Sequence, residues 1–179
     1  FLPDAESDPA NLFAVNVGGT VNLAWAVVET GTNTRLVYIS SAEVYGMVEP
    51  SKMPMDENFP VQPANLYAYS KAFAEDILFH AVEREGLRAV VCRPFTHIGP
   101  RQSSKFAASG FARQLAEIEK GRAPRVIKVG NLEAKRDIVD VRDMVRAYRL
   151  ASEITDSPGP FNIGSGEAIT ISHLLDILV

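Results

Sequence analysis

The sequence predicts an α/β fold with a doubly wound, mainly parallel sheet and helices on both faces. Two observations carry this prediction. Short apolar runs typical of buried strands alternate with longer segments of helical periodicity. Polar residues follow the apolar runs directly. Alternating strands and helices form βαβ units. Because such sheets bind ligands at the carboxyl ends of their strands, the residues just after each strand are the candidate functional positions.

The first helix is expected from Pro9 to Glu29. Asp8 is a suitable N-cap, with proline at the first helical position, and Gly31 fits the C-terminal stop. The pair Gly18-Gly19 lies inside this helix at a cost of about 1 kcal/mol per glycine. We therefore expect the pair to allow close packing against a neighbouring backbone.

Three strands and three further helices are expected after it. The strands are Leu36–Ile39, Ala89–Cys92 and Val126–Val129. The helices are Asn65–Glu85, with Phe73, Ile77, Leu78 and Ala81 on its apolar face, a helix through Phe111, Leu115 and Ile118 that stops at Gly121, and Asp140–Ser152.

Composition excludes several classes of function. A length of 179 residues corresponds to about one domain. The formal net charge of −4 argues against nucleic acid as a partner. No apolar run is long enough to predict a membrane span. Cys92, the single cysteine, excludes an intrachain disulfide and a cysteine-rich metal site, and we expect it to be buried and inert. We expect no metal ion and a cytoplasmic location.

A constellation of polar residues surrounds the first two strands. Ser40 and Ser41 follow the first strand, and Tyr67 and Lys71 lie four residues apart on one face of the next helix. A cation beside a phenol favours the phenolate, so we expect the pKa of Tyr67 to fall toward neutral pH. The Ser41 hydroxyl can hydrogen-bond the same oxygen or a substrate carbonyl. Together these side chains form a proton donor and acceptor suited to the interconversion of carbonyl and alcohol groups.

Together these motifs resemble the extended short-chain dehydrogenases/reductases, the sugar-nucleotide epimerase, dehydratase and reductase group. The resemblance runs from Phe1 to Val179 and includes the segments Asn16–Leu23, Ser40–Gly46, Tyr67–Lys71, Arg136–Asp143 and Phe161–Gly166. It implies a Rossmann-like fold whose amino-terminal part is missing. Residues 1–95 would form the carboxy-terminal part of the nucleotide-binding domain. Residues 96–179 would form a mixed region with the substrate-binding portion, returning to the sheet in places.

The resemblance also implies roles for individual residues. Ser41, Tyr67 and Lys71 correspond to the family's catalytic residues, and the cofactor is NADP or NAD. The cofactor-binding positions are Ser40, Tyr67, Lys71, Pro94, Phe95 and His97. The substrate-binding positions are Ala42, Glu43, Thr96, Arg113 and Arg136. Arg136 would hold the nucleotide diphosphate; the alternative is a salt bridge to Asp137 or Asp140. Relatives often form homodimers or homotetramers, through the helices equivalent to 18–29 and 67–85.

The closest resemblance is to the GDP-sugar branch, in the segments His97–Gln102, Phe111–Ala116 and Val129–Asp137. It implies NAD(P)H-dependent reduction of the C4 ketone of GDP-4-keto-6-deoxy-mannose. Two alternatives stay open. The first is a GDP-mannose 4,6-dehydratase or an epimerase with Glu43 as the base, and the second is a non-catalytic NAD(P)-sensing protein. Thr96 departs from the asparagine usual at this position.

The glycine-rich loop that cradles the cofactor pyrophosphate in this family is absent from the sequence. We therefore expect the chain by itself to bind the cofactor poorly and to be inactive.

Overall fold

The computed structural model describes residues 7–154 and 157–179. The chain divides into two compact units. The parallel-sheet unit comprises the described residues up to Phe95 together with Val145–Ile163. The mixed-sheet unit comprises Thr96–Met144 and Gly164–Val179. Each is described by itself.

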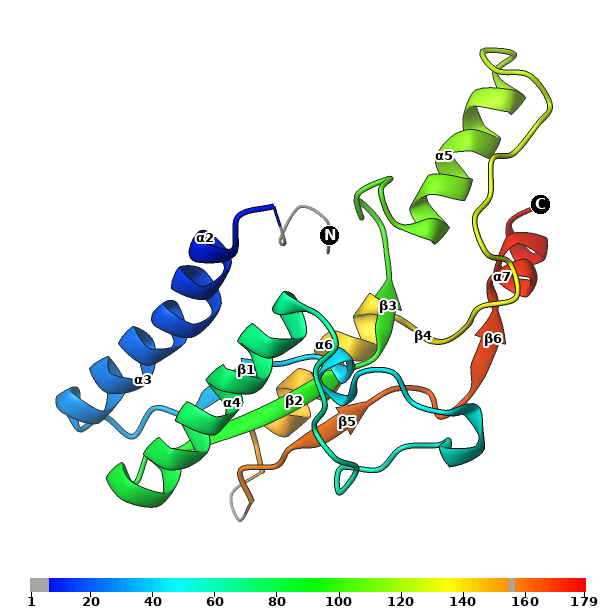
Figure 1. Ribbon diagram of the computed structural model, residues 1–179. Coiled ribbons are helices and arrows are strands. Elements are labelled where there is room, and N and C mark those ends of the chain that lie inside the picture. Colours follow the sequence, from blue (N-terminus) through cyan, green and yellow to red (C-terminus); the bar gives the residue numbers. More distant parts are fainter. Residues whose placement is uncertain (1–6, 155–156) are drawn as a thin grey trace. The chain divides into compact units, whose positions relative to one another are not determined.

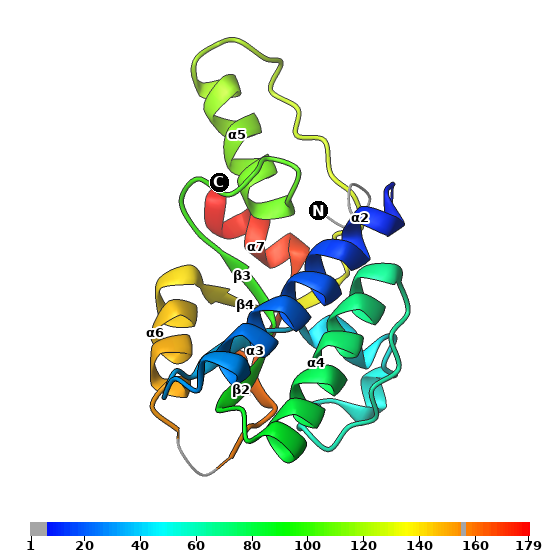
Figure 2. The same ribbon diagram turned by 90° about the vertical axis from the view of Figure 1, so that its left-hand side faces the viewer.

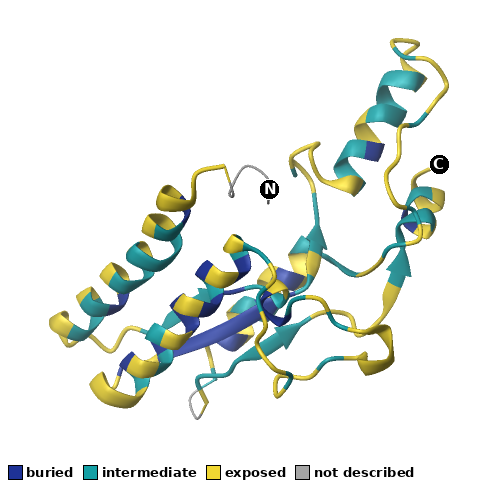
Figure 3. Ribbon diagram, in the orientation of Figure 1, coloured by how far each residue is buried: buried dark blue, intermediate teal, exposed yellow. Residues whose placement is uncertain are grey.

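The parallel-sheet unit contains three strands, β1 (Leu36–Ile39), β2 (Ala89–Pro94) and β5 (Phe161–Ile163). They are hydrogen-bonded in the order β1-β2-β5, and both pairs are parallel. The central strand β2 is buried along its whole length (Figure 3). The two predicted strands here are confirmed, and β5 is an addition to them.

One long helix opens this unit. It consists of α2 (Pro9–Phe13), the π-helical turn η1 (Ala14–Gly18) and α3 (Gly19–Thr30). The Asp8 carboxylate accepts from the backbone N–H of Asn11, and Gly31 adopts the left-handed conformation that ends the helix. α3 lies beside α4 (Leu66–Glu85), which Asn65 caps and Gly86 ends (Figures 1 and 2). The caps predicted for the first helix, Asp8 and Gly31, are confirmed.

Helices cover both faces of the parallel sheet, as predicted. Side chains alternate along a strand. Leu36 and Tyr38 therefore pack with Ala89 against α3 and α4, and Val37 and Ile39 pack on the other face. That second face also contains Cys92, which is buried, and the end of α6 (Val141–Ala151) (Figure 2).

Two expectations about these helices are wrong. Phe73 is 54% exposed, because alanines, Glu75 and Leu78 form the buried face of α4 and small side chains let its neighbours approach. Phe73 instead meets the edge of the Phe13 ring. The pair Gly18-Gly19 is not closely packed: among the described residues, nothing lies within 4 Å of a Cβ added at either glycine.

The helix Pro9–Thr30 is the one described helix with the length and apolar composition of a membrane span. Core helices of soluble proteins and signal sequences pass the same test, so this result is weak evidence of a span. Little of the helix is buried, however. Apolar side chains such as Val15 and Leu23 remain uncovered on it.

The mixed-sheet unit contains β3 (Thr96–Ile98), β4 (Lys135–Asp140) and β6 (Ala168–Thr170). β4 is central, parallel to β3 and antiparallel to β6. α5 (Ala107–Glu119) packs near α7 (Ile171–Leu178) (Figure 1). Phe111 of α5 is buried. The predicted helix through Phe111 is confirmed, and the left-handed Gly121 follows it.

The predicted strand Val126–Val129 is wrong. A side-chain amide replaces the partner strand: Gln114 of α5 accepts from the Lys128 N–H at 2.8 Å and donates to its carbonyl at 3.1 Å. Val126 and Val129 are 69% and 45% exposed. The segment 126–129 is therefore hydrogen-bonded to α5 and does not join a sheet.

Candidate active site

The turn after β1 presents Ser41. The Ser40 N–H donates to the Cys92 carbonyl at 2.8 Å, and Ser41 is the extended N-cap of a 3₁₀ turn, η2 (Ala42–Tyr45). Ser41 Oγ accepts from the N–H of Glu43 at 3.2 Å. Gly46 ends the turn with φ of 70°, where a Cβ would collide with the Gln62 carbonyl. The serine is therefore held by backbone geometry on both sides.

Tyr67 and Lys71 lie on the first two turns of α4. Lys71 Nζ donates to the carbonyl of Ile39, the last residue of β1, at 2.8 Å. The same nitrogen lies 5.2 Å from the centre of the Tyr38 ring and 5.8 Å from that of Tyr67. Both distances fall within the range of cation–π attraction. The strand end and the two rings thus fix the ammonium group.

Burial dominates the titration of this pair. It raises the pKa of Tyr67 above its ordinary value of 10.0; a hydrogen bond with Ser41 acts in the opposite direction, and the charge of Glu43 adds to the rise. Burial lowers the pKa of Lys71, against the charge of Glu75. The expected fall in the Tyr67 pKa is wrong because desolvation disfavours the phenolate. Tyr67 is therefore a protonated phenol at neutral pH, able to donate a proton.

Glu43 is exposed beside this pair. Asn65 Nδ2 donates to Glu43 Oε2 at 3.5 Å, while Asn65 Oδ1 accepts from the N–H of Ala68 at 2.8 Å. Asn65 therefore caps α4 and contacts the turn that contains Glu43. Ala42, also expected near the substrate, is half-buried in the same turn.

A second set of hydrogen bonds supports the helix below Tyr67. Asn16 Nδ2 donates to Ser70 Oγ at 2.9 Å, and Ser70 Oγ donates to the Tyr67 carbonyl at 2.8 Å. Ser70 is fully buried. Sequence reasoning quoted Asn16 only as part of a motif and gave Ser70 no role. The available signal was a side-chain amide inside a mainly apolar helix.

A buried charged pair was missed altogether. Glu75 of α4 and Arg93 of β2 are 2% and 4% exposed and form a salt bridge of 2.6 Å. Arg93 also donates to the Tyr45 hydroxyl at 3.0 Å, and that hydroxyl donates to Asn162 Oδ1 at 2.7 Å. An arginine in a buried strand was the signal, because such a charge needs a partner.

The remaining expected cofactor-binding residues lie at or near strand ends. Ser40 is buried, and its Oγ has no hydrogen-bond partner within the part of the chain that the structure describes. Pro94 ends β2, and the N–H of Phe95 donates to the Ile163 carbonyl at 2.9 Å. His97, in β3, belongs to the mixed-sheet unit, and its carbonyl accepts from Gln102 Nε2 at 3.1 Å.

Three expected substrate-binding residues also belong to the mixed-sheet unit, and all are exposed. They are Thr96, Arg113 and Arg136. Arg113 Nη1 donates to Ser104 Oγ at 3.1 Å. Arg136 Nη1 donates to the carbonyl of the preceding residue at 2.7 Å.

Arg136 does not form the alternative salt bridge considered from the sequence. Asp137 accepts from the backbone of Ser165 and Gly166, and Asp140 pairs with Arg142 at 2.6 Å. Arg136 has no carboxylate partner among residues 7–154 and 157–179. Its guanidinium group is available to an anion.

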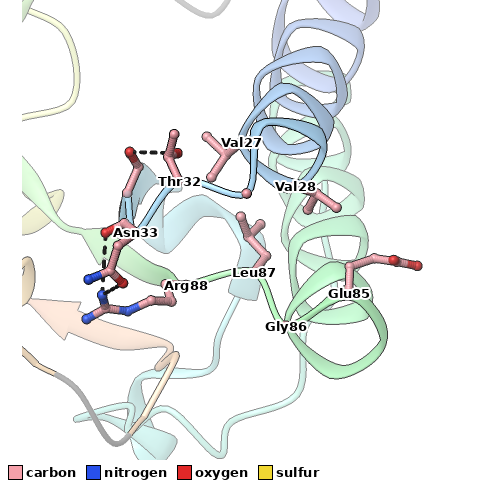
Figure 4. A pocket seen from close by; sticks show the side chains of 10 residues that line it. Val27, Val28, Thr32, Asn33, Glu85, Gly86, Leu87 and Arg88 are labelled. Atoms are coloured by element: carbon pink, nitrogen blue, oxygen red, sulfur yellow. Dashed lines mark hydrogen bonds between the residues drawn. The ribbon is translucent and has the colours of Figure 1, made fainter.

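A surface pocket of the parallel-sheet unit lies away from these groups. It is lined by the ends of α3 and α4 and by the residues before β1 and β2, where Arg88 bonds to Asn33 (Figure 4). This is the amino-terminal edge of the strands, whereas Ser41 follows the carboxyl end of β1. No expected site residue lines it. The described residues also contain no cluster of three His, Cys, Asp or Glu side chains able to hold a metal ion.

Comparison with known proteins gives consistent matches. Residues 2–164 match the NAD dependent epimerase/dehydratase family. The chain is 35% identical, over 178 residues, to GDP-6-deoxy-D-mannose reductase of Pseudomonas aeruginosa, covering 99% of this chain and 59% of that protein. It is 31% identical, over 160 residues, to human GDP-mannose 4,6 dehydratase, covering 88% and 42%.

Solved structures show the same similarity. RMD from Pseudomonas aeruginosa complexed with NADPH superposes with a TM-score of 0.94 at 35% identity, covering 99% of this chain and 60% of that one. UDP-glucose 4-epimerase from Thermotoga maritima with UDP-glucose gives 0.85 at 27% identity, covering 99% and 56%. The chain thus spans about three fifths of the Pseudomonas relatives that it matches.

Proposed function

Because the chain belongs to the NAD dependent epimerase/dehydratase family, we propose that the complete protein reduces the C4 ketone of GDP-4-keto-6-deoxy-mannose with NADPH or NADH. The observation that carries the proposal is the grouping of Ser41, Tyr67 and Lys71, with a protonated phenol beside a fixed ammonium group. The similarity to the Pseudomonas reductase supports the choice of substrate.

The residues present suit the nicotinamide end of such a cofactor. An ammonium group has three donors, and Lys71 uses one of them on the Ile39 carbonyl. The other donors are available to hydroxyl groups of a bound nucleotide, together with Tyr67 on the same helix face. When bound, the nicotinamide supplies the hydride equivalent that reaches the carbonyl carbon.

The protein's own groups manage the proton. Tyr67 donates its phenolic proton to the carbonyl oxygen, since burial keeps the phenol protonated. Ser41 holds the carbonyl in line through its hydroxyl. The charge of Lys71 stabilises the phenolate that remains. General acid help of this kind contributes roughly 10²–10⁴-fold.

Arg136 and Arg113 then bind the diphosphate of the nucleotide, Arg136 through an exposed guanidinium group that has no carboxylate partner in the described part of the chain. Guanidinium groups match phosphate oxygens in bidentate geometry. Thr96 supplies one hydroxyl to the sugar nucleotide.

The test uses the complete protein to which this chain belongs. We expect it to oxidise NADPH or NADH in proportion to added GDP-4-keto-6-deoxy-mannose, followed by the loss of reduced-nicotinamide absorbance. Tyr67→Phe abolishes this turnover. Tyr69→Phe, a matched change at an exposed position of the same helix, leaves it intact. Absence of consumption by the unsubstituted protein contradicts a reductase.

A second candidate is a GDP-mannose 4,6-dehydratase or an epimerase with Glu43 as the base. The exposed Glu43 carboxylate, close enough to raise the pKa of Tyr67, favours it. In that case GDP-mannose is converted without net cofactor consumption, and Glu43→Gln abolishes conversion. A non-catalytic NAD(P)-sensing protein, the third candidate, would show no turnover and no effect of Tyr67→Phe.

We also propose that the complete protein is a homodimer that covers the outer face of α4. Leu66, Tyr69 and Phe73 follow one another at helical spacing and are 37%, 45% and 54% exposed. The uncovered apolar helix Pro9–Thr30 lies next to them, since Phe13 meets Phe73. A surface of this kind on two helices suits a second copy of itself.

Light scattering tests this assignment. Phe73→Ser is expected to weaken the dimer and to raise the monomer fraction at micromolar concentration. Asp76→Ser, at an exposed polar position one turn further along, is the control. A monomeric unsubstituted protein would contradict the proposal.

A further inference from the structure

Glu75 lies one helical turn after Lys71, on the same side of α4. It is a carboxylate with 2% of its surface exposed. Glutamate and lysine four residues apart on a helix attract one another. A buried carboxylate also requires a cationic or hydrogen-bonding partner. Lys71 is therefore the partner that the helix alone would offer.

The structure gives Glu75 a different partner. Arg93 Nε donates to both carboxylate oxygens, at 3.1 and 3.2 Å, and Nη2 donates to Oε2 at 2.6 Å. Three hydrogen bonds from one guanidinium group occupy most of the carboxylate's acceptor positions. Lys71 Nζ is left to the Ile39 carbonyl and to the rings of Tyr38 and Tyr67.

The other end of Arg93 reaches the turn that Ser41 caps. Arg93 Nη1 donates to the Tyr45 hydroxyl at 3.0 Å, and its guanidinium carbon lies 4.9 Å from the centre of the Tyr45 ring. Tyr45 is the last residue of η2 and is 1% exposed. One side chain of β2 thus connects α4, which contains Tyr67 and Lys71, to the turn that begins after Ser41.

We propose that Glu75 and Arg93 are positioning residues for the Ser41–Tyr67–Lys71 site: Arg93 neutralises Glu75 and so leaves the Lys71 ammonium group directed to the Ile39 carbonyl and Tyr67. The proposal rests on the proposed function in assigning the pair to that site. The groups that act on Lys71 and Tyr67 are Tyr38 from β1, Ser41 before η2, Glu43 from η2, Tyr148 from α6 and Glu75 from α4 itself. Of these, Glu75 is the buried acid.

Charge coupling predicts opposite effects for the two single substitutions. Arg93→Met releases the Glu75 carboxylate to Lys71 and raises the Lys71 pKa. Glu75→Gln leaves the guanidinium charge uncompensated near Lys71 and lowers it further. Each shift is expected to be about one pH unit, a usual size for the effect of a neighbouring charge. The double substitution removes both charges and returns the Lys71 pKa close to its original value.

If Glu75 and Arg93 only stabilised the fold, their substitution would shift the Lys71 pKa differently. Loosening the core exposes Lys71 to water, which raises its lowered pKa toward the ordinary value in every variant. Glu75→Gln therefore distinguishes the two explanations, because positioning predicts a fall and loosening predicts a rise. This variant keeps the shape of the side chain and serves as the test if Arg93→Met does not fold.

The experiment measures the pH dependence of Lys71 acetylation by limiting acetic anhydride in the complete protein, with peptide mass spectrometry. Arg149→Met and Glu153→Gln, which alter an exposed ion pair on the same unit, are the matched controls and leave Lys71 unchanged. A rise in both Glu75→Gln and Arg93→Met, or no recovery in the double variant, overturns the proposal. Because no substrate is needed, opposite shifts without sugar-nucleotide turnover would uphold the pair while refuting the proposed function.

Discussion

The two units of the molecule hold their polar side chains in different ways. In the parallel-sheet unit, Glu75 and Arg93 are almost fully buried, and Lys71 is fixed by a strand carbonyl. In the mixed-sheet unit, Arg113 and Arg136 are exposed, and within the described residues they bond only to a serine hydroxyl and a neighbouring carbonyl. The groups proposed to perform chemistry are therefore positioned in advance, whereas those proposed to bind an anion remain in water.

Energetics explains why the two arrangements coexist. Removing two charges from water costs several kcal/mol per ion, which only good geometry and further hydrogen bonds offset. Arg93 meets this condition with bonds to Glu75 and Tyr45. An exposed arginine remains hydrated before a ligand binds, so it costs the fold little free energy. A charge-assisted hydrogen bond to a phosphate then stabilises the complex. This difference in burial predicts that core substitutions destabilise the two units unequally.

The largest expected effect compares the same substitution in both units. Leu78→Ala, at a side chain 1% exposed in the α4 core, is expected to lower the free energy of unfolding by about 2–5 kcal/mol. Leu115→Ala, at a partly exposed position of α5, is expected to cost about 1 kcal/mol. Urea denaturation measures both. Equal decreases in the free energy of unfolding would show that α5 is as tightly packed as α4. They would contradict the expectation that core substitutions affect the two units unequally.

The sequence predicted what short-range chemistry determines. Asp8 and the left-handed Gly31 mark the ends of the first helix through local hydrogen bonds and φ, which a sequence records directly. Apolar runs identified the two longer parallel strands. The family was likewise predicted from motifs at strand ends, and the match over residues 2–164 confirms it.

Contacts between residues far apart in the sequence could not be predicted from local patterns. Nothing near Lys128 reveals that Gln114 will bond to its backbone and keep the segment out of a sheet. Glu75 and Arg93 are 18 residues apart, and although an arginine in a buried strand signals a need for a partner, nothing local to Arg93 identifies Glu75 as that partner. Which of Phe73 and Glu75 faces inward depends on the side of α4 that meets Arg93 of β2, and helical periodicity does not predict that side. Desolvation of Tyr67 likewise follows from packing, so its pKa was predicted in the wrong direction.

An intermediate effect tests the mixed-sheet side of the comparison. Arg136→Ala is expected to raise the KM for the sugar nucleotide about 10–100-fold, since a charge-assisted hydrogen bond contributes about 1.5–3 kcal/mol. The kcat is expected to stay nearly constant, because Tyr67 and Lys71 are untouched. Steady-state kinetics of the complete protein separates the two constants.

Arg122→Ala is the control for this measurement, because Arg122 is also an exposed arginine of the same unit. It is expected to change neither constant. A fall in kcat for Arg136→Ala with KM unchanged would place Arg136 in the chemical step. That result would contradict the proposal that the mixed-sheet unit binds the anion while the parallel-sheet unit performs the chemistry.

The smallest expected effect concerns the glycine pair on the uncovered helix. Gly19 has an ordinary helical φ of −59°, and an added Cβ meets nothing within 4 Å among the described residues. Gly19→Ala is therefore expected to stabilise a monomer by about 1 kcal/mol through helix propensity. Gly46→Ala, at φ of 70° with the Gln62 carbonyl in the way, is the contrasting control and is expected to destabilise.

Urea denaturation at low and high protein concentration sharpens this last measurement. If a second copy covers the helix closely, the added methyl group of Gly19→Ala clashes in the dimer. The gain at low concentration then becomes a loss at high concentration. A gain at both concentrations means that the glycines stay in open space and that any dimer uses the stripe around Phe73 alone. In that case the close packing expected from the sequence is wrong for the dimer as well as for the single chain.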